Sequence, residues 1–293
     1  MNKVLLLIIS FYSLNLFSQD ISENTLKEYE DTLSQIANNI MHGETETFRR
    51  ESNLGFISEL KEILKYKPSY LYPFDSLITI SILSPYDKSF RIFNWILKKE
   101  NGEYEYFGII ILPPKENDKY NTLVELKDNS QQIINPEEKI LDQNNWYGSL
   151  YYNIISTKKK NAYYTLLGWD GNNKKSTKKI IDVIQIKNDK VIFGKNIFKK
   201  NNQTENRVIL EYSSKASISL QYDEKNKRIV FDHLSPIEEE KKGLNQFYIP
   251  DGEYDSYNYK KNMWEYQKNI NVKNKEKEPK RRKKRNEKGL FGS

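Results

Sequence analysis

The sequence predicts an α+β protein in which two N-terminal helices precede a predominantly antiparallel β body and a basic C-terminal tail. Between residues 22 and 66, apolar residues recur at steps of three and four, as they do along the buried stripe of a helix. From about Leu77 the pattern changes to short strand-like runs separated by turn residues. These runs lack the strand–helix–strand alternation of a parallel sheet, which leaves a sandwich, a meander, a barrel-like sheet or a small propeller as alternatives.

Residues 1–19 have the order of charged and apolar residues that is typical of a secretory signal peptide. Lys3 precedes an apolar run from Val4 to Ile9, which continues with interruptions to Phe17, and polar sequence follows from Asp20. The apolar part is shorter than the roughly 20 residues that a membrane-spanning helix needs. We therefore expect the mature chain to be exported, to the periplasm or out of the cell.

The segment 20–70 is expected to be helical. Asp20 and Glu23 are placed to cap a first helix over residues 22–41, and Gly43 is placed to end it. A second helix is expected over Leu54–Tyr66, with residues 44–53 as a candidate extension; it closes before Pro68, because a residue that precedes proline avoids the helical region. The apolar stripe of the first helix consists of Leu26, Tyr29, Leu33, Ile36 and Ile40.

Residues 71–270 are expected to form the antiparallel body. The clearest strand is Ala216–Tyr222, where apolar side chains alternate with polar ones, as on a strand with one buried face. Asn101-Gly102, between two strand candidates, is a strong hairpin signal. The other expected strands are Leu77–Leu83, Phe90–Leu97, Tyr104–Leu112, Thr122–Leu126, Ser149–Ile155, Tyr163–Trp169, Ile180–Ile186, Val191–Phe193, Arg207–Tyr212, Arg228–Leu234, Tyr254–Tyr259 and Trp264–Lys268.

The positive charge of the chain is concentrated in its tail, residues 271–293. Between Lys273 and Lys288 there are ten basic and three acidic residues, and the remaining chain holds 37 of each. The tail lacks core-forming groups, so it is expected to be disordered by itself. Export argues against a nucleic-acid partner and favours contact with an anionic envelope surface, a solvated tail without a target being the alternative. The basic cluster consists of Lys280, Arg281, Arg282, Lys283, Lys284 and Arg285.

Several segments resemble an uncharacterised exported family of Bacteroidota. They are the Leu-Phe-Ser-Gln end of the signal, Tyr163–Asn172, Arg207–Tyr212 with Ala216–Leu220, Ile229–Pro236 and Asp251–Tyr259. The similarity is strongest over residues 145–270. The resemblance implies an envelope location and a β-rich body, and it brings no activity and no functional residue.

The chain contains no cysteine and only two histidines, so we expect no metal site or cofactor. Asp232-His233 is the nearest approach to a catalytic pair. Adjacent strand residues point to opposite faces, however, so Asp232 should not orient His233 as in a hydrolase triad, and a structural role at a strand end is the alternative. Asp170 lies in a loop with oxygen ligands, as in a calcium site; Lys174 follows without the closing acid, which favours a hairpin turn.

The sequence therefore predicts an exported envelope protein that is a non-catalytic interaction or structural module. One alternative is an envelope hydrolase that uses paired carboxylates. Another is a glycan- or peptide-binding module that presents aromatic rings from Trp146–Tyr152 or from Tyr254–Tyr266, for which ordinary packing within a sheet is the competing interpretation.

Overall fold

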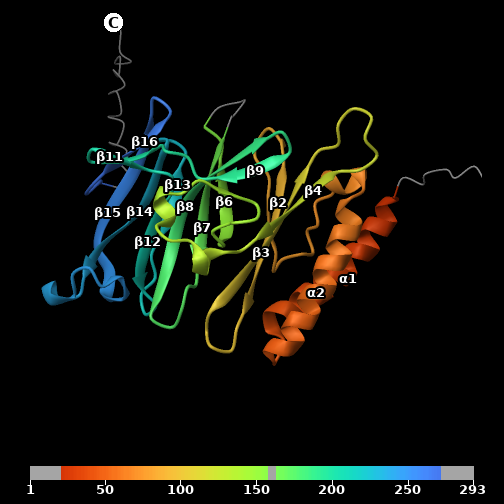
Figure 1. Cartoon of the computed structure of the whole chain (residues 1–293), viewed down its shortest axis with the longest axis horizontal. Helices are drawn as coiled ribbons and strands as arrows, with labels where there is room; N and C mark the ends of the chain where they lie inside the picture. Colours follow the sequence, from red (N-terminus) through yellow and green to blue (C-terminus); the bar gives the residue numbers. More distant parts are fainter. Residues whose placement is uncertain (1–20, 158–162, 272–293) are drawn as a thin grey trace, which may run out of the picture.

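The computed structural model describes residues 21–157 and 163–271 and confirms the α+β fold, with two helices followed by a predominantly antiparallel β body. The predicted signal peptide and basic tail lie outside the described residues. Figure 1 shows four layers side by side: the helix pair, then three successive sheets. Over the described residues, no helix combines the length and the apolar character needed to cross a membrane.

The two helices are α1 (Glu23–His42) and α2 (Glu46–Leu64). The hydroxyl of Ser22 caps α1 by accepting the amide hydrogen of Thr25, so the cap is Ser22 and Glu23 is the first helical residue; Asp20 lies outside the described residues. Gly43 ends α1, as expected, with its amide hydrogen donated to the Asn39 carbonyl. The hydroxyl of Thr45 caps α2, so residues 46–53 belong to this helix.

The described strands form three sheets. The first has the order β1 (Ser81–Leu83), β2 (Arg91–Lys98), β3 (Tyr104–Leu112) and β4 (Thr122–Lys127). The second has the order β5 (Leu141–Asp142), β9 (Lys190–Phe193), β8 (Ser176–Lys187), β7 (Tyr164–Asp170) and β6 (Leu150–Ile155), and β12 (Val208–Ser213) also pairs with β8. The third has the order β11 (Gln203–Glu205), β10 (Phe198–Lys200), β16 (Met263–Gln267), β15 (Tyr248–Lys260), β14 (Arg228–Pro236) and β13 (Leu220–Asp223).

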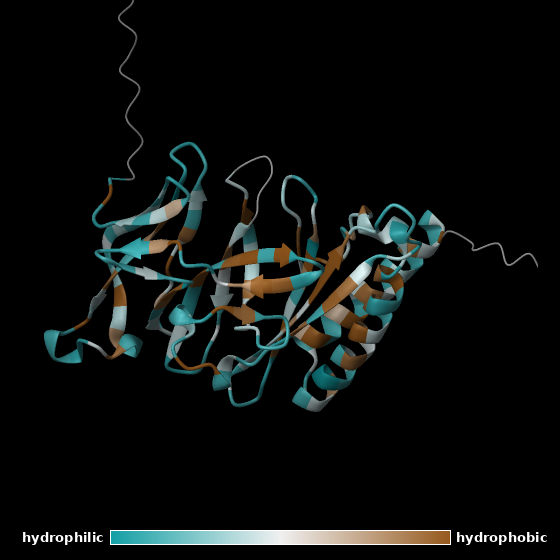
Figure 2. Ribbon diagram, turned by 45° about the horizontal axis from the view of Figure 1, so that its top comes forward, coloured by the Kyte–Doolittle hydropathy of each residue, from teal (hydrophilic) through white to brown (hydrophobic). Residues whose placement is uncertain are grey.

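Each pair of neighbouring layers shares one apolar core, so the first two sheets are covered on both faces. Along β2, Phe93 and Trp95 pack toward the helices, whereas Ile92 packs toward the second sheet. In the second sheet, Ile184 faces the first sheet and Val183 faces the third. Strands covered on both faces carry nearly continuous apolar runs, and several strands in the middle of the molecule are accordingly brown in Figure 2.

Buried polar side chains join neighbouring layers. Asn94 of β2 is fully buried; its side-chain oxygen accepts the amide hydrogen of Tyr151 at 2.6 Å and its amide group donates to the Phe107 carbonyl at 2.8 Å. Between the second and third sheets, the indole N–H of Trp264 donates to the Thr165 hydroxyl at 3.0 Å. Because unpaired polar groups are costly in a core, these bonds favour one registry of the layers.

The strand predicted over Ala216–Tyr222 is only partly present, because the ladder of β13 begins at Leu220. The amide of Ser219 is instead bound by the carboxylate of Asp232, at 2.6 Å. The predicted strand Leu77–Leu83 is likewise reduced to Ser81–Leu83, since Leu77 and Ile80 lie in successive turns.

Candidate functional site

Two hollows in the β body contain the residues that the sequence singles out. The first, the His233 groove, has a volume of about 310 Å³ and lies where β12 faces the third sheet. The second, the Asp170 cleft, has a volume of about 520 Å³ and lies between the first and second sheets. The charged, amide and tyrosine side chains that line the groove are Glu137, Lys200, Glu205, Glu211, Asp232, His233, Asn245, Tyr248, Asp255, Tyr257 and Tyr266.

His233 lies at a register shift in β14, between Asp232 and Leu234. Its neighbour Asp232 binds the amide of Ser219, whereas the Nδ1 atom of His233 lies 2.7 Å from the Oδ2 atom of Asp255 on β15. The carboxylate that orients the imidazole is therefore Asp255, 22 positions along the chain. Asp232 and His233 line the same groove without acting as a pair.

Asp255 is almost fully buried and accepts three hydrogen bonds. Besides the contact with His233, its Oδ2 atom accepts the Tyr266 hydroxyl at 2.6 Å, and its Oδ1 atom accepts the amide of Asn269 at 3.0 Å. Burial and the bond to Asp255 raise the pKa of the Tyr266 phenol, which keeps it protonated and donating. Asp255 thus fixes both rings and the chain end that follows β16.

The second nitrogen of the His233 ring faces another carboxylate. Its Nε2 atom lies 3.8 Å from the Oδ2 atom of Asp251, which accepts the Ser235 hydroxyl at 2.6 Å. Burial acts to raise the pKa of Asp251, but the bonds from Ser235 and from the Glu253 amide, together with His233, lower it below its ordinary value. Ser235 donates to Asp251, so the described contacts form no Ser–His–Asp sequence.

Four carboxylates that line the groove have no salt bridge within the described ranges; Glu211 and Asp232 accept hydrogen bonds instead, whereas Glu137 and Glu205 do not. Glu137 belongs to the 3-10 turn Pro136–Glu138, and Glu205 ends β11. Burial raises the pKa of Glu205, and the charge of Glu137 raises it further, while Lys200 opposes the shift. Lys200 itself lies with its Nζ atom 4.7 Å from the centre of the Tyr266 ring. The groove therefore carries negative charge that its own side chains compensate only in part.

Asp170 lies at the end of β7, where the hairpin to β8 begins, and its carboxylate is held by three neighbours. Oδ1 accepts the Tyr106 hydroxyl and the amide of Asn172, both at 2.7 Å, and Oδ2 lies 3.4 Å from the Nζ atom of Lys178. Among the described residues, no three His, Cys, Asp or Glu side chains gather to hold a metal ion. The arrangement is a clamp between Tyr106 of the first sheet and the hairpin of the second.

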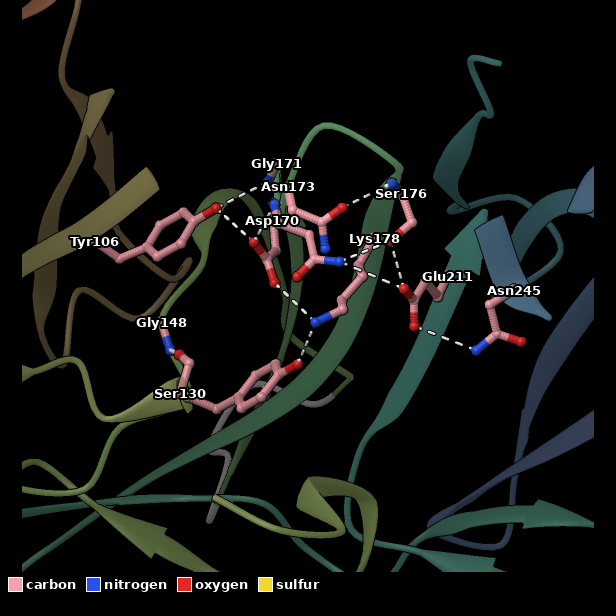
Figure 3. A network of polar contacts seen from close by, with 12 residues as sticks. Tyr106, Ser130, Gly148, Asp170, Gly171, Asn173, Ser176, Lys178, Glu211 and Asn245 are labelled. Carbon is pink, nitrogen blue, oxygen red and sulfur yellow. Dashed lines mark hydrogen bonds and ion pairs between the residues drawn. The ribbon is translucent and has the colours of Figure 1, made fainter. Parts of the chain in front are cut away.

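Lys178 completes this clamp from β8. Its Nζ atom donates to the Tyr147 hydroxyl at 3.1 Å, and although burial acts to lower the pKa of Lys178, Tyr147 and Asp170 raise it above its ordinary value. Figure 3 shows that the network continues away from the cleft. The Ser176 hydroxyl donates to Glu211 at 2.5 Å, and Glu211 accepts the Asn245 side chain at 3.2 Å, which brings the network to the wall of the groove.

The aromatic rings proposed for glycan stacking are largely buried. Trp146, Tyr147 and Tyr151 lie in the core or at its edge, and Tyr257 and Trp264 are enclosed between the second and third sheets. Tyr152 is 39% exposed, but the ammonium of Lys179 lies 4.8 Å from its ring centre. These rings offer no shared open face. The basic cluster Lys280–Arg285 lies outside the described residues.

Comparison of this chain with protein-family models, curated proteins and solved structures found no match. Function is therefore inferred from the chemistry of the groove and the cleft. Of the groove residues, the sequence pointed to Asp232 and His233 and missed Asp255, Glu205 and Glu137. The one sequence signal for Asp255 was its place in a predicted strand, Tyr254–Tyr259, that neighbours β14.

Proposed function

We propose that this protein is an exported, non-catalytic binding module whose His233 groove takes a positively charged group of its ligand. Export follows from the expected signal peptide over residues 1–19. The observation that carries the choice of ligand is that Glu137 and Glu205 line one groove without a salt-bridge partner among the described residues; burial and Glu137 also raise the pKa of Glu205. A cation placed between these two carboxylates would relieve the cost of holding them together.

The aromatic part of the groove favours the same chemistry. The half-buried rings of Tyr248 and Tyr266 line it together with the carboxylates. An ammonium or guanidinium group is attracted both by carboxylates and by the face of an aromatic ring. The contact of Lys200 with the Tyr266 ring is an example of this interaction within the protein itself. Acidic and aromatic side chains in one hollow thus suit a basic side chain of a peptide.

The size of the groove supports a side chain as the bound group. Its volume of about 310 Å³ is at the lower end of the range of small-molecule sites, which is roughly 300–1,000 Å³. One lysine or arginine side chain fills such a space better than a folded domain or an extended glycan would. The partner class is therefore a basic peptide segment, which the exported protein would meet outside the cytoplasm.

A chain isolated from its native cell with Met1 still attached would contradict export.

We expect the double substitution Glu137→Gln and Glu205→Gln to weaken binding of a labelled hexalysine peptide by about tenfold or more, or about 1.4 kcal/mol. The reason is that the two substitutions remove the uncompensated negative charge of the groove while keeping its shape. Isothermal calorimetry or fluorescence anisotropy on the full chain measures the change. The matched control is Glu28→Gln with Glu51→Gln, which removes two exposed carboxylates from the helices.

The pH dependence of the same binding has a defined sign. Because the pKa of Glu205 is raised, this carboxyl gains its proton at a higher pH than an ordinary glutamate does. Affinity for hexalysine should therefore fall as the pH is lowered through that range, and it should fall less in the Glu205→Gln variant. If the Glu28→Gln, Glu51→Gln control loses as much hexalysine affinity as the Glu137→Gln, Glu205→Gln variant, the groove is not the binding site.

A hydrolase that uses paired carboxylates is the second candidate, and the same pair favours it. A glutamate with a raised pKa can act as a general acid beside an ionised carboxylate that acts as a base. This candidate predicts that the full chain cleaves a 4-nitrophenyl glycoside and that Glu205→Gln lowers the rate by about a hundredfold or more. Binding of hexalysine without turnover of any glycoside in a panel would decide for the non-catalytic module.

A further inference from the structure

The chain carries its own cationic segment, and the described residues that precede it lie at the wall of the groove. Residues 273–288 contain ten basic and three acidic side chains, and the other charges of the protein cancel. The last residues before the tail are fixed by hydrogen bonds to β15. The amide of Asn269 donates to the Oδ1 atom of Asp255 at 3.0 Å, and the amide of Ile270 donates to the Tyr254 carbonyl at 2.7 Å.

Asp255 links this anchor directly to the binding site. The same carboxylate that accepts the Asn269 amide also holds the ring of His233 and the hydroxyl of Tyr266, both of which line the groove. Asn269, among the last described residues before the tail, therefore lies beside a carboxylate of the groove. An extended chain advances at most about 3.3–3.6 Å per residue, so the nine steps from Asn271 to Lys280 reach up to about 30 Å. The basic cluster can reach the groove without any movement of the sheets.

Tethering makes even weak complementarity effective. A ligand held on a short flexible linker is present at its site at an effective concentration in the millimolar range. The tail supplies lysine and arginine side chains, the groups that the carboxylates and tyrosines of the groove suit. The groove supplies the matching negative charges, because its Glu137 and Glu205 have no salt-bridge partner among the described residues.

We propose that the His233 groove is a docking site for the basic tail of the same chain, with a side chain from Lys280–Arg285 placed between Glu137 and Glu205. This inference rests on the proposed function, because it assigns the occupant of the same cation site. A basic peptide from another protein must then displace the tail before it binds. An anionic surface that binds the tail would free the groove. Binding of the tail to such a surface would therefore favour binding of a basic peptide in the groove.

The first test uses the full chain with six substitutions, in which the basic residues 280–285 are all replaced by glutamine. Labelled hexalysine should bind this variant at least about tenfold more tightly than it binds the wild type, because the competing tail is neutralised. A second full-length variant, Glu276→Gln with Glu278→Gln and Glu287→Gln, makes the tail more cationic and should weaken hexalysine binding. Equal affinities for the wild type and both tail variants would overturn the docking proposal.

The outcomes separate this proposal from the one on which it rests. If Glu137→Gln with Glu205→Gln lowers hexalysine affinity and the tail variants do not change it, the groove binds cations and the tail does not occupy it. The glutamine substitutions of Glu137 and Glu205 can also be added to the six-residue tail variant. If this addition does not weaken hexalysine binding, the groove is not a cation site and both proposals fail.

A second measurement detects the contact without a probe. A carbodiimide joins a lysine amine to a carboxylate only when the two are in contact. In the monomeric wild-type chain, mass spectrometry should identify cross-links from Lys280, Lys283 or Lys284 to Glu137 or Glu205, and 0.5 M salt should suppress them by screening. Cross-links that reach only the helix carboxylates, or that form only between two copies of the chain, would overturn docking within one molecule.

Discussion

Replacement of Arg207 by leucine is expected to lower the free energy of unfolding by about 3–5 kcal/mol. Arg207 and Asp182 are both fully buried, and the Nε atom of the guanidinium lies 3.2 Å from the Oδ2 atom of Asp182. The Nη1 atom also donates to the carbonyls of Pro136 and Lys139. Without Arg207, the buried carboxylate of Asp182 keeps its bonds from the Val183 amide and the Tyr151 hydroxyl but loses its opposite charge, and two carbonyls lose a donor. Urea unfolding followed by far-ultraviolet circular dichroism measures the loss.

The comparison for this prediction is an ion pair nearer the surface. Arg228 pairs with Asp223 at 2.9 Å across the β13–β14 hairpin, with both side chains partly exposed. Arg228→Leu should cost at most about 1 kcal/mol, since partly exposed pairs contribute little. The double substitution Arg207→Met and Asp182→Leu should recover most of the stability, because it leaves no buried charge alone. If the Arg207→Leu protein were as stable as the Arg228→Leu protein, the buried pair would contribute no more to stability than the partly exposed pair.

Replacement of Trp264 by alanine is expected to lower the free energy of unfolding by about 3–5 kcal/mol, because it leaves a cavity and removes buried apolar surface. Trp264 is fully buried on β16, between the second and third sheets, and its ring lies 4.9 Å from that of Tyr259. Its indole N–H donates to the Thr165 hydroxyl on β7. The substitution therefore removes both the largest apolar side chain of this core and its polar link. Thermal and urea unfolding measure the change.

Two substitutions distinguish these contributions. Trp264→Phe keeps most of the ring and removes the hydrogen bond, so it should cost clearly less than Trp264→Ala. Tyr86→Ala removes a ring that is 86% exposed and should change stability by no more than about 0.5 kcal/mol. If Trp264→Ala were as mild as Tyr86→Ala, the interface between the second and third sheets would not depend on this core.

The fold class could be predicted because its signals are local. The steps of three and four in α1 and the turn signal at Asn101-Gly102 depend on neighbouring residues, and both correspond to observed elements. The alternation over Ala216–Tyr222 predicted a strand that begins four residues too early, because β13 starts at Leu220. Alternation tells which side chains are buried, but not which backbone groups find a strand partner, and the Ser219 amide is taken by the Asp232 side chain.

The site was less predictable because its residues meet only through tertiary structure. That Asp232 does not orient His233 follows from the geometry of a strand, but the identity of Asp255 requires the pairing of β14 with β15. Glu137 belongs to a 3-10 turn and Glu205 to the strand β11, far apart in the sequence, so their electrostatic coupling has no sequence signal. The sequence contains many acids, and spacing alone does not show which of them share a hollow.

The order of the layers has a consequence for biosynthesis. The helices and the first sheet use residues 23–127, the second sheet uses residues 141–213, and the third uses residues 198–267. A chain that emerges from its N-terminus can thus assemble most of the first two sheets while the rest is still being made. The third sheet differs, because β10 pairs in parallel with β16, where Phe198 lies beside Trp264. One face of the second sheet therefore stays uncovered until nearly the whole chain has been synthesised, and that interval is when the nascent protein most needs protection from self-association.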